Sequence, residues 1–365
     1  MNKAKAAVYC GVEKPFEVTE FEVLEPSAGS ARLELVASGV CGTDIHIHTG
    51  RLATEPPKII GHEFLGRITA ISAEDSEKSG LKIGDLAVVD IAQPCGKCKL
   101  CKTGDDANCV NMGVTNGGNP YEAPHFFGGY AEVCFAPIEN IIKIPDGVDP
   151  IAACVFACPG PTVLHSFRLA KQAGCDFSTA ETAVVQGIGP VGCMAVAYFA
   201  SLNIKNIVAL CVGVTPEKED FVKKLGASEV IDISKVSEEE LTKHIMDLSG
   251  GLGADVVLEA SGSPKAVPTA LEILRNRGVY LVPGQYSNHG GIEIQPQLIT
   301  FKALHIIGSS QYSICDVADY MKFLSNNAEL QARIKNLATC YSLSDINTAI
   351  NDAKAGKNIK TVLIK

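Results

Sequence analysis

The sequence changes its pattern near residue 150, and this change limits the folds that the chain can adopt. Residues 1 to about 150 contain short β-like runs, such as ARLELVASGV, LGRITAI and LAVVDIA, separated by glycine, proline and charged residues. From about 157 to 300, apolar strands such as TAVVQG and NIVALCV alternate with helical patterns such as VGCMAVAYFASL. Alternation of this kind is typical of βαβ units. We therefore expect an α/β protein in which a β-rich domain precedes a doubly wound parallel-sheet domain.

Length and charge narrow the range of possible functions. A chain of 365 residues exceeds the size at which one core keeps growing, which favours two domains. The net charge of −9 would repel a phosphate backbone, so we expect no nucleic acid partner. The N-terminal segment lacks the apolar core of a signal peptide, and no run has the roughly 18 apolar residues of a membrane span. We therefore expect a cytoplasmic protein without membrane contact, whose 14 cysteines are metal ligands and core residues rather than disulfides.

Four cysteines within one short segment form the most specific local motif. The spacing C-x2-C-x2-C-x7-C fills a tetrahedral zinc shell and leaves no position for a substrate, so the site predicted here is structural. An iron–sulfur cluster is the chemical alternative, but the C-x3-C-P ending of such runs is absent. Unliganded surface cysteines are the least favoured interpretation. The four residues are Cys95, Cys98, Cys101 and Cys109.

A second set of metal-type residues is scattered along the chain. Cys41, His62 and Cys158 would give a Cys2His set with a fourth position free for water or an alcohol, as a catalytic zinc requires. Each residue alone is weak evidence, because a single cysteine is more often a small core residue and a single histidine is usually hydrogen-bonded. Their spacing in the sequence does not join them.

A glycine-rich turn lies between an apolar strand and a helical pattern in the segment VVQGIGPVG. Gly187, Gly189 and Gly192 supply G-x-G-x-x-G, with Pro190 and Val191 between the last two glycines. In a dinucleotide site the first glycine permits the turn, the second lets backbone approach the pyrophosphate, and the third permits close helix packing. We expect the pyrophosphate of NAD or NADP to bind here, at the N-terminus of the helix.

The sequence leaves the choice between NAD and NADP open. NAD-binding sites usually place an acidic residue about 20 positions after the glycine motif to bond the ribose hydroxyls. Here that position falls on Gly213, so the carboxylate that would repel a 2′-phosphate is missing. Lys218 is a candidate cation for such a phosphate, while Glu217 lies beside it and could serve NAD instead.

The motifs CGTDIH, GHEFLG, the four-cysteine segment, GGYAEV and GIGPVG occur in this order along nearly the whole chain. This order resembles the zinc-containing medium-chain dehydrogenase/reductase family. The resemblance implies a GroES-like catalytic domain over residues 1–156, completed by about 302–365, and a Rossmann domain over 157–301. It also implies two zinc ions per subunit, NAD or NADP as cofactor, and a homodimer or homotetramer. The activity implied is hydride transfer between NAD(P) and a secondary alcohol, polyol or related hydroxy compound.

The resemblance also assigns roles around the catalytic zinc. Cys41 and His62 become zinc ligands, Glu63 is a carboxylate beside the metal, and Cys158 takes the third protein-ligand position. Polyol dehydrogenases of the family often have glutamate at the third position, so an analogy to sorbitol as substrate is weakened. Cys154 is the rival for this position, although the proline and histidine that follow Cys158 resemble the family pattern.

A proton pathway is implied by the same resemblance. Thr43 is expected to take the substrate proton, and His46 to release it to solvent after passage through the ribose hydroxyls. Two residues later, His48 could replace His46, because alternation in a strand would put both on one face. Asp44 is expected to orient His62 and fix its tautomer.

Two questions about function stay open on the sequence alone. A protein of the same fold that binds NAD(P) but has lost catalysis, and acts as a regulator or structural partner, is the alternative function. The segment NGGNPYEAPHFFGG carries Tyr121, His125 and Phe126, which could line or cover a substrate pocket, although a solvated loop is favoured. The identity of the alcohol is not encoded in any motif.

Overall fold

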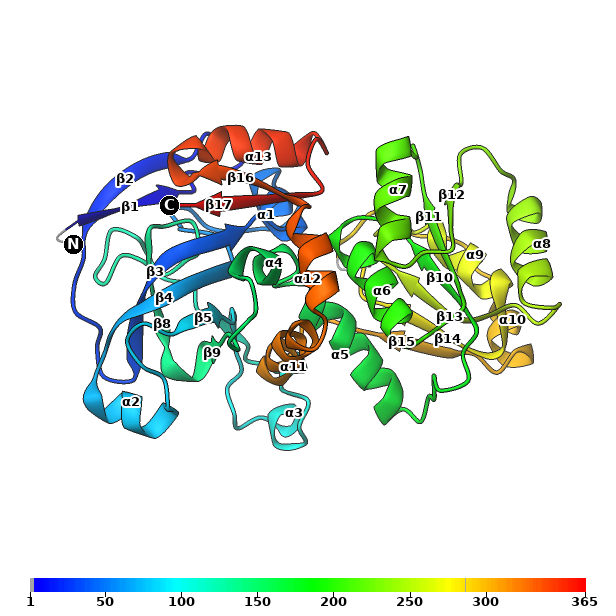
Figure 1. The fold of residues 1–365 in the computed structure, drawn as a ribbon, viewed down its shortest axis with the longest axis horizontal. Helices are drawn as coiled ribbons and strands as arrows, with labels where there is room; N and C mark the ends of the chain where they lie inside the picture. Colours follow the sequence, from blue (N-terminus) through cyan, green and yellow to red (C-terminus); the bar gives the residue numbers. More distant parts are fainter. Residues whose placement is uncertain (1–2, 286) are drawn as a thin grey trace. The chain divides into compact units, whose positions relative to one another are not determined.

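The computed structural model describes residues 3–285 and 287–365, and the chain divides into two compact units (Figure 1). The first unit comprises Met1–Pro161 and Gln311–Lys365, and the second comprises Thr162–Ser310. Both divisions fall later than the predicted boundaries at 156/157 and 301/302. The second division is later because the strand His305–Gly308 still pairs with the sheet of the second unit. In the described part of the chain, no helix has the length and apolarity needed to cross a bilayer.

The first unit is built on antiparallel β-structure. Its strands are β1 (Lys3–Val8), β2 (Glu17–Glu22), β3 (Ser30–Gly39), β4 (Glu63–Ile71), β5 (Leu86–Val89), β6 (Ala92–Gln93), β7 (Gly113–Val114), β8 (Val133–Pro137), β9 (Ile141–Lys143), β16 (Ala338–Ser342) and β17 (Lys360–Ile364). Its helices are α1 (Gly42–His48), α2 (Ala73–Ser79), α3 (Lys99–Lys102), α4 (Pro150–Val155), α11 (Ile314–Ser325), α12 (Ala328–Lys335) and α13 (Ile346–Lys354), and α5 (Pro159–Gln172) begins in it.

The main sheet of the first unit joins segments from both ends of the chain. Its order is β16-β17-β3-β4-β5-β9, and β8 pairs with the N-terminal half of β3. The C-terminal strand β17 pairs antiparallel with β3 through Val362 and Leu363. The C-terminal segment therefore completes the first unit.

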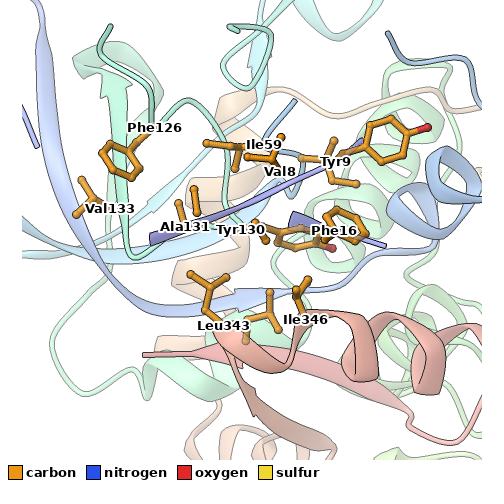
Figure 2. Close-up of a cluster of buried hydrophobic side chains, with 14 of the residues drawn as sticks. Val8, Tyr9, Phe16, Ile59, Phe126, Tyr130, Ala131, Val133, Leu343 and Ile346 are labelled. Atoms are coloured by element: carbon orange, nitrogen blue, oxygen red, sulfur yellow. The ribbon is translucent and has the colours of Figure 1, made fainter. Parts of the chain in front are cut away.

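A buried apolar cluster packs the N-terminal hairpin against this sheet (Figure 2). Side chains from distant parts of the chain meet here, including Tyr9, Phe126, Tyr130 and Ile346, all at most 1% exposed. Burial of such large side chains stabilises the unit by roughly 1.5–3 kcal/mol each. The cluster fixes the loop before β8 and the start of α13 relative to β1, and so gives the functional residues on neighbouring loops a rigid support.

The second unit is a parallel sheet with helices on both faces. Its strands are β10 (Thr182–Gln186), β11 (Asn206–Cys211), β12 (Glu229–Asp232), β13 (Ala254–Glu259), β14 (Leu274–Val282) and β15 (His305–Gly308). Its helices, besides most of α5, are α6 (Pro190–Ser201), α7 (Pro216–Leu225), α8 (Glu238–Leu248), α9 (Ala266–Ile273) and α10 (Pro296–Phe301).

The strand order is β12-β11-β10-β13-β14-β15, and all neighbours are parallel. The chain adds strands on one side of β10 up to β12 and then on the other side from β13 onward, so the order of winding reverses between β10 and β13. One face of the sheet, including Val184 and Val257, packs with Leu241 of α8 and Leu271 of α9. Side chains alternate between faces, and Val185 on the opposite face lies against α6 at Gly192. This is the predicted doubly wound arrangement. In such sheets ligands bind beyond the carboxyl ends of the strands at the point of reversal.

Candidate active site

Four metal-type side chains from three separate segments meet inside the first unit. The ligand atoms of Cys41, His62, Glu63 and Cys158 all lie within 4.8 Å of one another. Cys41 is the N-cap of α1 directly after β3, His62 and Glu63 stand at the start of β4, and Cys158 directly precedes α5. Because β3 and β4 are paired neighbours, the sheet itself brings the first two segments together. The third arrives with the turn after α4.

The spacing of these atoms fits a tetrahedral zinc ion. The Sγ atoms of Cys41 and Cys158 are 3.9 Å apart, and two thiolates on one zinc ion at about 2.3 Å each would be about 3.8 Å apart. Both cysteines are half-buried, whereas Glu63 is fully buried. The set therefore offers two sulfurs and an imidazole beside one carboxylate, and two sulfurs with an imidazole are a donor set found in catalytic zinc sites.

His62 is held by a buried carboxylate. Its Nδ1 lies 3.5 Å from Oδ1 of Asp44, whose Oδ2 accepts hydrogen bonds from the backbone N–H of Cys41 at 2.9 Å and the hydroxyl of Tyr130 at 2.8 Å. Burial lowers the pKa of His62, but the charges of Asp44 and Cys41 more than offset it and raise this pKa well above its usual value. Asp44 therefore takes the orienting position that sequence analysis assigned to it.

Glu63 forms an ion pair with Lys360 of β17, and both side chains are almost fully inaccessible, at 0% and 1%. Burial raises the pKa of Glu63 to about 7 even though the charge of Lys360 lowers it. A Cβ on Gly39 would lie 1.8 Å from Glu63 Oε2, so only glycine fits at this point of β3. The second carboxylate oxygen, Oε1, is buried without a hydrogen-bond partner. Glu63 thus stands beside the metal-type residues with one acceptor atom still available.

The rival cysteine takes no part in this group. Cys154 is fully buried on α4, where its thiol donates to the backbone carbonyl of Glu63 at 3.7 Å. Burial raises its pKa above the range in which a thiolate forms near neutrality. Of the two cysteines considered for the third ligand position, the structure brings Cys158 to the group.

The segment that carries the proposed proton pathway is a helix, so the expectation of an alternating strand at residues 46 and 48 is wrong. In α1, consecutive positions are about 100° apart, so residues two apart point to different sides. His48 turns into the core, where its ring stacks on Phe16 and its Nε2 lies 3.0 Å from the carbonyl of Lys14. His46 is half-buried, and the Thr43 hydroxyl lies 3.7 Å from Cys41 Sγ. The two histidines, which would be equivalent in a strand, therefore point to different sides of the helix.

The four-cysteine lobe is a second compact ligand set. The ligand atoms of Cys95, Cys98, Cys101 and Cys109 lie within 4.8 Å of one another. Backbone N–H groups donate to these sulfurs, including Cys95 to Cys109 at 3.2 Å and Cys101 to Cys98 at 3.5 Å. Hydrogen bonds from backbone lower the pKa of Cys95 to about 6 and also lower that of Cys98. Four sulfurs with no open side match a structural zinc shell.

The glycine turn of the second unit has the predicted backbone geometry. Gly187 has φ +94°, a conformation that other residues rarely adopt. Gly189 is exposed, and a Cβ there would meet no atom within 4 Å, so the turn leaves room for a ligand. A Cβ on Gly192 would lie 1.8 Å from the carbonyl oxygen of Gly187, so the third glycine is required for close packing of helix and turn. Pro190 and Val191 begin α6, half-buried beside this turn.

Comparison with known proteins agrees with these features. Residues 27–146 match the family model described as alcohol dehydrogenase GroES-like domain, and residues 190–326 match zinc-binding dehydrogenase. The chain is 30% identical to 5-exo-hydroxycamphor dehydrogenase of Pseudomonas putida, covering 100% of this chain and 99% of that protein. It is 29% identical to D-xylulose reductase A of Aspergillus oryzae, covering 89% and 87%. An alcohol dehydrogenase structure from Thermotoga maritima superposes with a TM-score of 0.89 at 27% identity, over 99% of each chain.

This chain belongs to the zinc-containing medium-chain dehydrogenase/reductase family. It is therefore a zinc-dependent oxidoreductase that uses NAD(P) and acts on a small hydroxy or carbonyl compound. The β-rich first unit is the GroES-like domain, and the parallel-sheet second unit is the Rossmann domain.

Two residues beside this candidate active site were missed by sequence reasoning. Lys360 stands near the C-terminus, 297 positions after its partner Glu63, and a lysine at the start of an apolar strand has no pattern that marks it as buried. Tyr130 lies within the family motif GGYAEV, but only the fold shows that its hydroxyl reaches Asp44. A Cβ on Gly61, beside His62, would lie 2.5 Å from the Tyr130 ring, which explains the glycine before the histidine.

The loop between β7 and β8 is exposed at some positions and packed at others. Phe126 is fully buried in the apolar cluster, so it neither lines a pocket nor meets solvent. His125 stacks on Phe21 at a ring-centroid distance of 5.2 Å. Tyr121 is 54% exposed and contacts Phe21 edge-on. The loop is thus anchored by one aromatic side chain and supported by two others.

Proposed function

We propose that this dehydrogenase transfers a hydride between NAD(P) and a secondary alcohol, polyol or related hydroxy compound at a zinc ion held by Cys41, His62 and Cys158. The observation that carries the proposal is the convergence of two thiols, one imidazole and a buried carboxylate within 4.8 Å. Relatives named for hydroxycamphor and xylulose support a hydroxy compound with a secondary carbinol carbon. A cysteine at the third position argues against close analogy to sorbitol oxidation.

The residues around the metal set its charge and position. When bound, zinc would supply Lewis acidity, which makes an alcohol easier to deprotonate near neutral pH. The thiolates of Cys41 and Cys158 would balance the two positive charges of the ion. Asp44, which is fully buried, holds the imidazole of His62 in place. The Lys360 partner keeps Glu63 from adding a further uncompensated charge at this site.

We assign the proton pathway to α1. Thr43 lies next to Cys41 and provides a hydroxyl that can accept a proton from the substrate and pass it on. His46, half-buried on the same helix, is the residue that would exchange this proton with solvent. His48 is unsuited to the role, since it is 6% exposed and its Nε2 lies at the Lys14 carbonyl.

A second zinc ion per subunit is proposed for the four-cysteine lobe. Four sulfur ligands in one segment, supported by backbone N–H groups, hold an ion without leaving a position for substrate. Its role would be to fix the fold of residues 95–109. The lobe has little other means of holding its shape, because only Ala107 and Cys109 within it are buried.

The dinucleotide is assigned to the carboxyl ends of the Rossmann strands. Gly187, Gly189, Pro190, Val191 and Gly192 would surround the pyrophosphate, whose negative charge the N-terminus of α6 favours. Gly213 and Lys218 belong to the turn and helix that follow β11, where the adenosine ribose is expected. Both NAD and NADP are compatible with the family.

Assembly into a homodimer or homotetramer is proposed on two grounds. The family resemblance implies it, and β15 is an edge strand of the Rossmann sheet. Ile306 on this strand is 43% exposed, and Phe301 at the end of α10 is 79% exposed. Exposed apolar side chains at a sheet edge favour association with another chain. We place the protein in the cytoplasm, where reduced thiols can serve as zinc ligands.

The decisive experiment is a substrate panel on protein whose zinc content has been measured. Secondary alcohols, sugar alcohols and hydroxy acids are assayed separately with NAD and NADP, and two zinc ions per subunit are expected. Turnover of at least one secondary alcohol class supports the proposal. Binding of NAD(P)H with one zinc ion and no turnover across the panel would instead indicate the catalytically silent regulatory or structural protein.

A further inference from the structure

The turn after β11 lacks an acidic side chain of its own but receives one from the neighbouring strand. Gly213 has φ +70°, is exposed, and has no atom within 4 Å of the position of a Cβ. In the β11–β12 register, the last residue of β11, Cys211, pairs with Asp232 at the end of β12. A carboxylate on β12 therefore reaches the turn that the missing ribose-binding residue would occupy.

Asp232 is tied into this turn through both of its oxygens. Oδ1 accepts from the backbone N–H of Gly213 at 3.3 Å, and Oδ2 accepts from that of Val214 at 3.2 Å. Oδ1 also accepts from the Ser234 hydroxyl at 2.6 Å and from the Ser234 N–H at 3.1 Å. With four donors and an exposed side-chain fraction of 8%, the carboxylate is fixed in position.

The carboxylate is ionised at neutral pH. The hydrogen bond from the Ser234 hydroxyl is the largest cause that lowers the pKa of Asp232, and the backbone N–H groups add to it against the opposing effect of burial. Its ion-pair partner Lys235 is 3.3 Å away but 71% exposed. Solvent and salt screen an exposed ammonium more than an enclosed carboxylate, so the negative charge dominates at the turn.

We propose that Asp232 is a specificity-determining residue that makes this dehydrogenase bind NAD more tightly than NADP. The inference rests on the proposed function, since it assumes that the dinucleotide ribose lies at this turn. The 2′-phosphate of NADP adds negative charge where Asp232 already supplies one, and the two backbone N–H groups that could bind a phosphate are used by Asp232. The 2′-hydroxyl of NAD meets neither obstacle. Lys218 is the cation that opposes this effect, because its charge acts on Cys211 at the end of β11.

The test is direct binding of NADH and NADPH to the purified zinc-loaded protein, followed by nucleotide fluorescence and needing no substrate. For the natural sequence, the Kd for NADPH is expected to be at least about fivefold higher than that for NADH. In Asp232→Asn this ratio should fall by about fivefold, mainly through tighter NADPH binding, because the charge is lost while the amide oxygen still accepts a backbone hydrogen bond.

Asp247→Asn is the matched control. Asp247 lies on α8, is 65% exposed and pairs with Lys243, so the variant makes the same change in net charge away from the turn. Its Kd ratio should equal that of the natural sequence. An unchanged ratio in a folded Asp232→Asn, or a natural preference for NADPH, would overturn the proposal. Failure of the natural protein to bind either nucleotide would refute the proposed function itself.

Lys235→Met keeps the test decisive if Asp232→Asn does not fold. The Lys235 side chain is mostly in solvent, so its loss should not disturb the turn. Removing it leaves the Asp232 charge less compensated, and the ratio of the NADPH Kd to the NADH Kd should rise by about twofold. A fall in this ratio would contradict the role assigned to Asp232.

Discussion

The two cysteine-rich sites of the GroES-like domain use similar atoms but are assembled in opposite ways. The four-cysteine lobe takes all its ligands from residues 95–109, and most of that segment is exposed or half-buried. The site around Cys41 takes its ligands from three segments that span 117 positions from Cys41 to Cys158. The lobe is thus encoded locally, whereas the active site exists only after the sheet has formed.

This difference determines what a metal ion bound at each site could do. The lobe offers four sulfurs and has few buried residues of its own, so an ion bound there would support the local fold. The active site is supported by its surroundings, through Asp44, Tyr130 and the ion pair of Glu63 with Lys360. An ion bound by Cys41, His62 and Cys158, as we propose, would leave a fourth position for substrate. The comparison predicts that mutations at the two sites fail differently.

The largest effect is expected for Cys41→Ser. Removing one thiolate should lower kcat/KM by about 1000-fold, because the Lewis acid is lost or misplaced. Thermal stability should change little, since Cys41 is half-buried and other contacts fix the site. Steady-state kinetics and nucleotide fluorescence on the same sample measure turnover and NAD(P)H binding separately. Wild-type turnover in this variant would mean that the catalytic zinc has been assigned to the wrong residues.

Lys360→Met should reduce the free energy of unfolding by about 3 kcal/mol, because the buried Glu63 carboxylate would lose its counter-charge. Denaturant titration of the purified protein gives this value. The double variant Lys360→Met/Glu63→Gln is the control and should recover most of the loss, since it buries no unpaired charge. Equal stability of the single and double variants would show that the loss of stability does not come from the unpaired charge of Glu63.

Cys98→Ser sharpens the contrast between the sites. It should lower the free energy of unfolding by about 2 kcal/mol and reduce zinc content from two ions to one per subunit, while kcat per folded molecule stays within about twofold. Zinc analysis, calorimetry and kinetics together test this. Cys134→Ser offers a comparison at a buried cysteine outside both ligand groups, where zinc content should not change. If Cys98→Ser abolished turnover in folded protein, the two sites would not be independent.

An effect that appears only above about pH 4 is expected at Asp90, which follows β5 and lies near the lobe. Burial raises its pKa to about 7, with the charges of Asp106 and Asp316 adding to the shift. The folded state then holds a proton that the unfolded chain releases near pH 4, so stability falls as pH rises from about 4 to 7. Asp90→Asn should therefore be more stable than the natural protein at pH 8, by roughly 1.4 kcal/mol for each pKa unit of the shift, and should show no gain at pH 4. Thermal melts at both pH values provide the measurement, and an equal gain at both would exclude the proton linkage.

Much of the fold could be predicted from the sequence because its signals are local. The glycine turn, the strand–helix alternation and the four-cysteine spacing each lie within a short segment, and the structure has all three. The exact boundaries could not be predicted, because β15 joins the Rossmann sheet only through pairing with β14. A short helix at residues 42–48 was also missed. It is capped by Cys41 and Asp44, but its sequence lacks the apolar repeat from which a helix is usually predicted.

The active site was predictable only in part. Cys41, His62 and Cys158 came from family resemblance rather than from spacing, and the structure brings them together. Lys360 could not have been found, because its partner is 297 positions away and its burial depends on the β17–β3 pairing. Asp232 was missed for a similar reason, since its carboxylate reaches the turn after β11 from a different strand. Most of the site features that could not be predicted from the sequence therefore depend on contacts between distant segments.

The most direct test of the central claim is anomalous X-ray diffraction from zinc-loaded crystals, recorded on both sides of the zinc absorption edge. Two peaks per subunit are predicted, one among Cys95, Cys98, Cys101 and Cys109, and one bonded to Cys41, His62 and Cys158 at about 2.0–2.3 Å from each ligand atom. A single peak in the lobe, with no zinc signal between Cys41 and Cys158, would contradict the account.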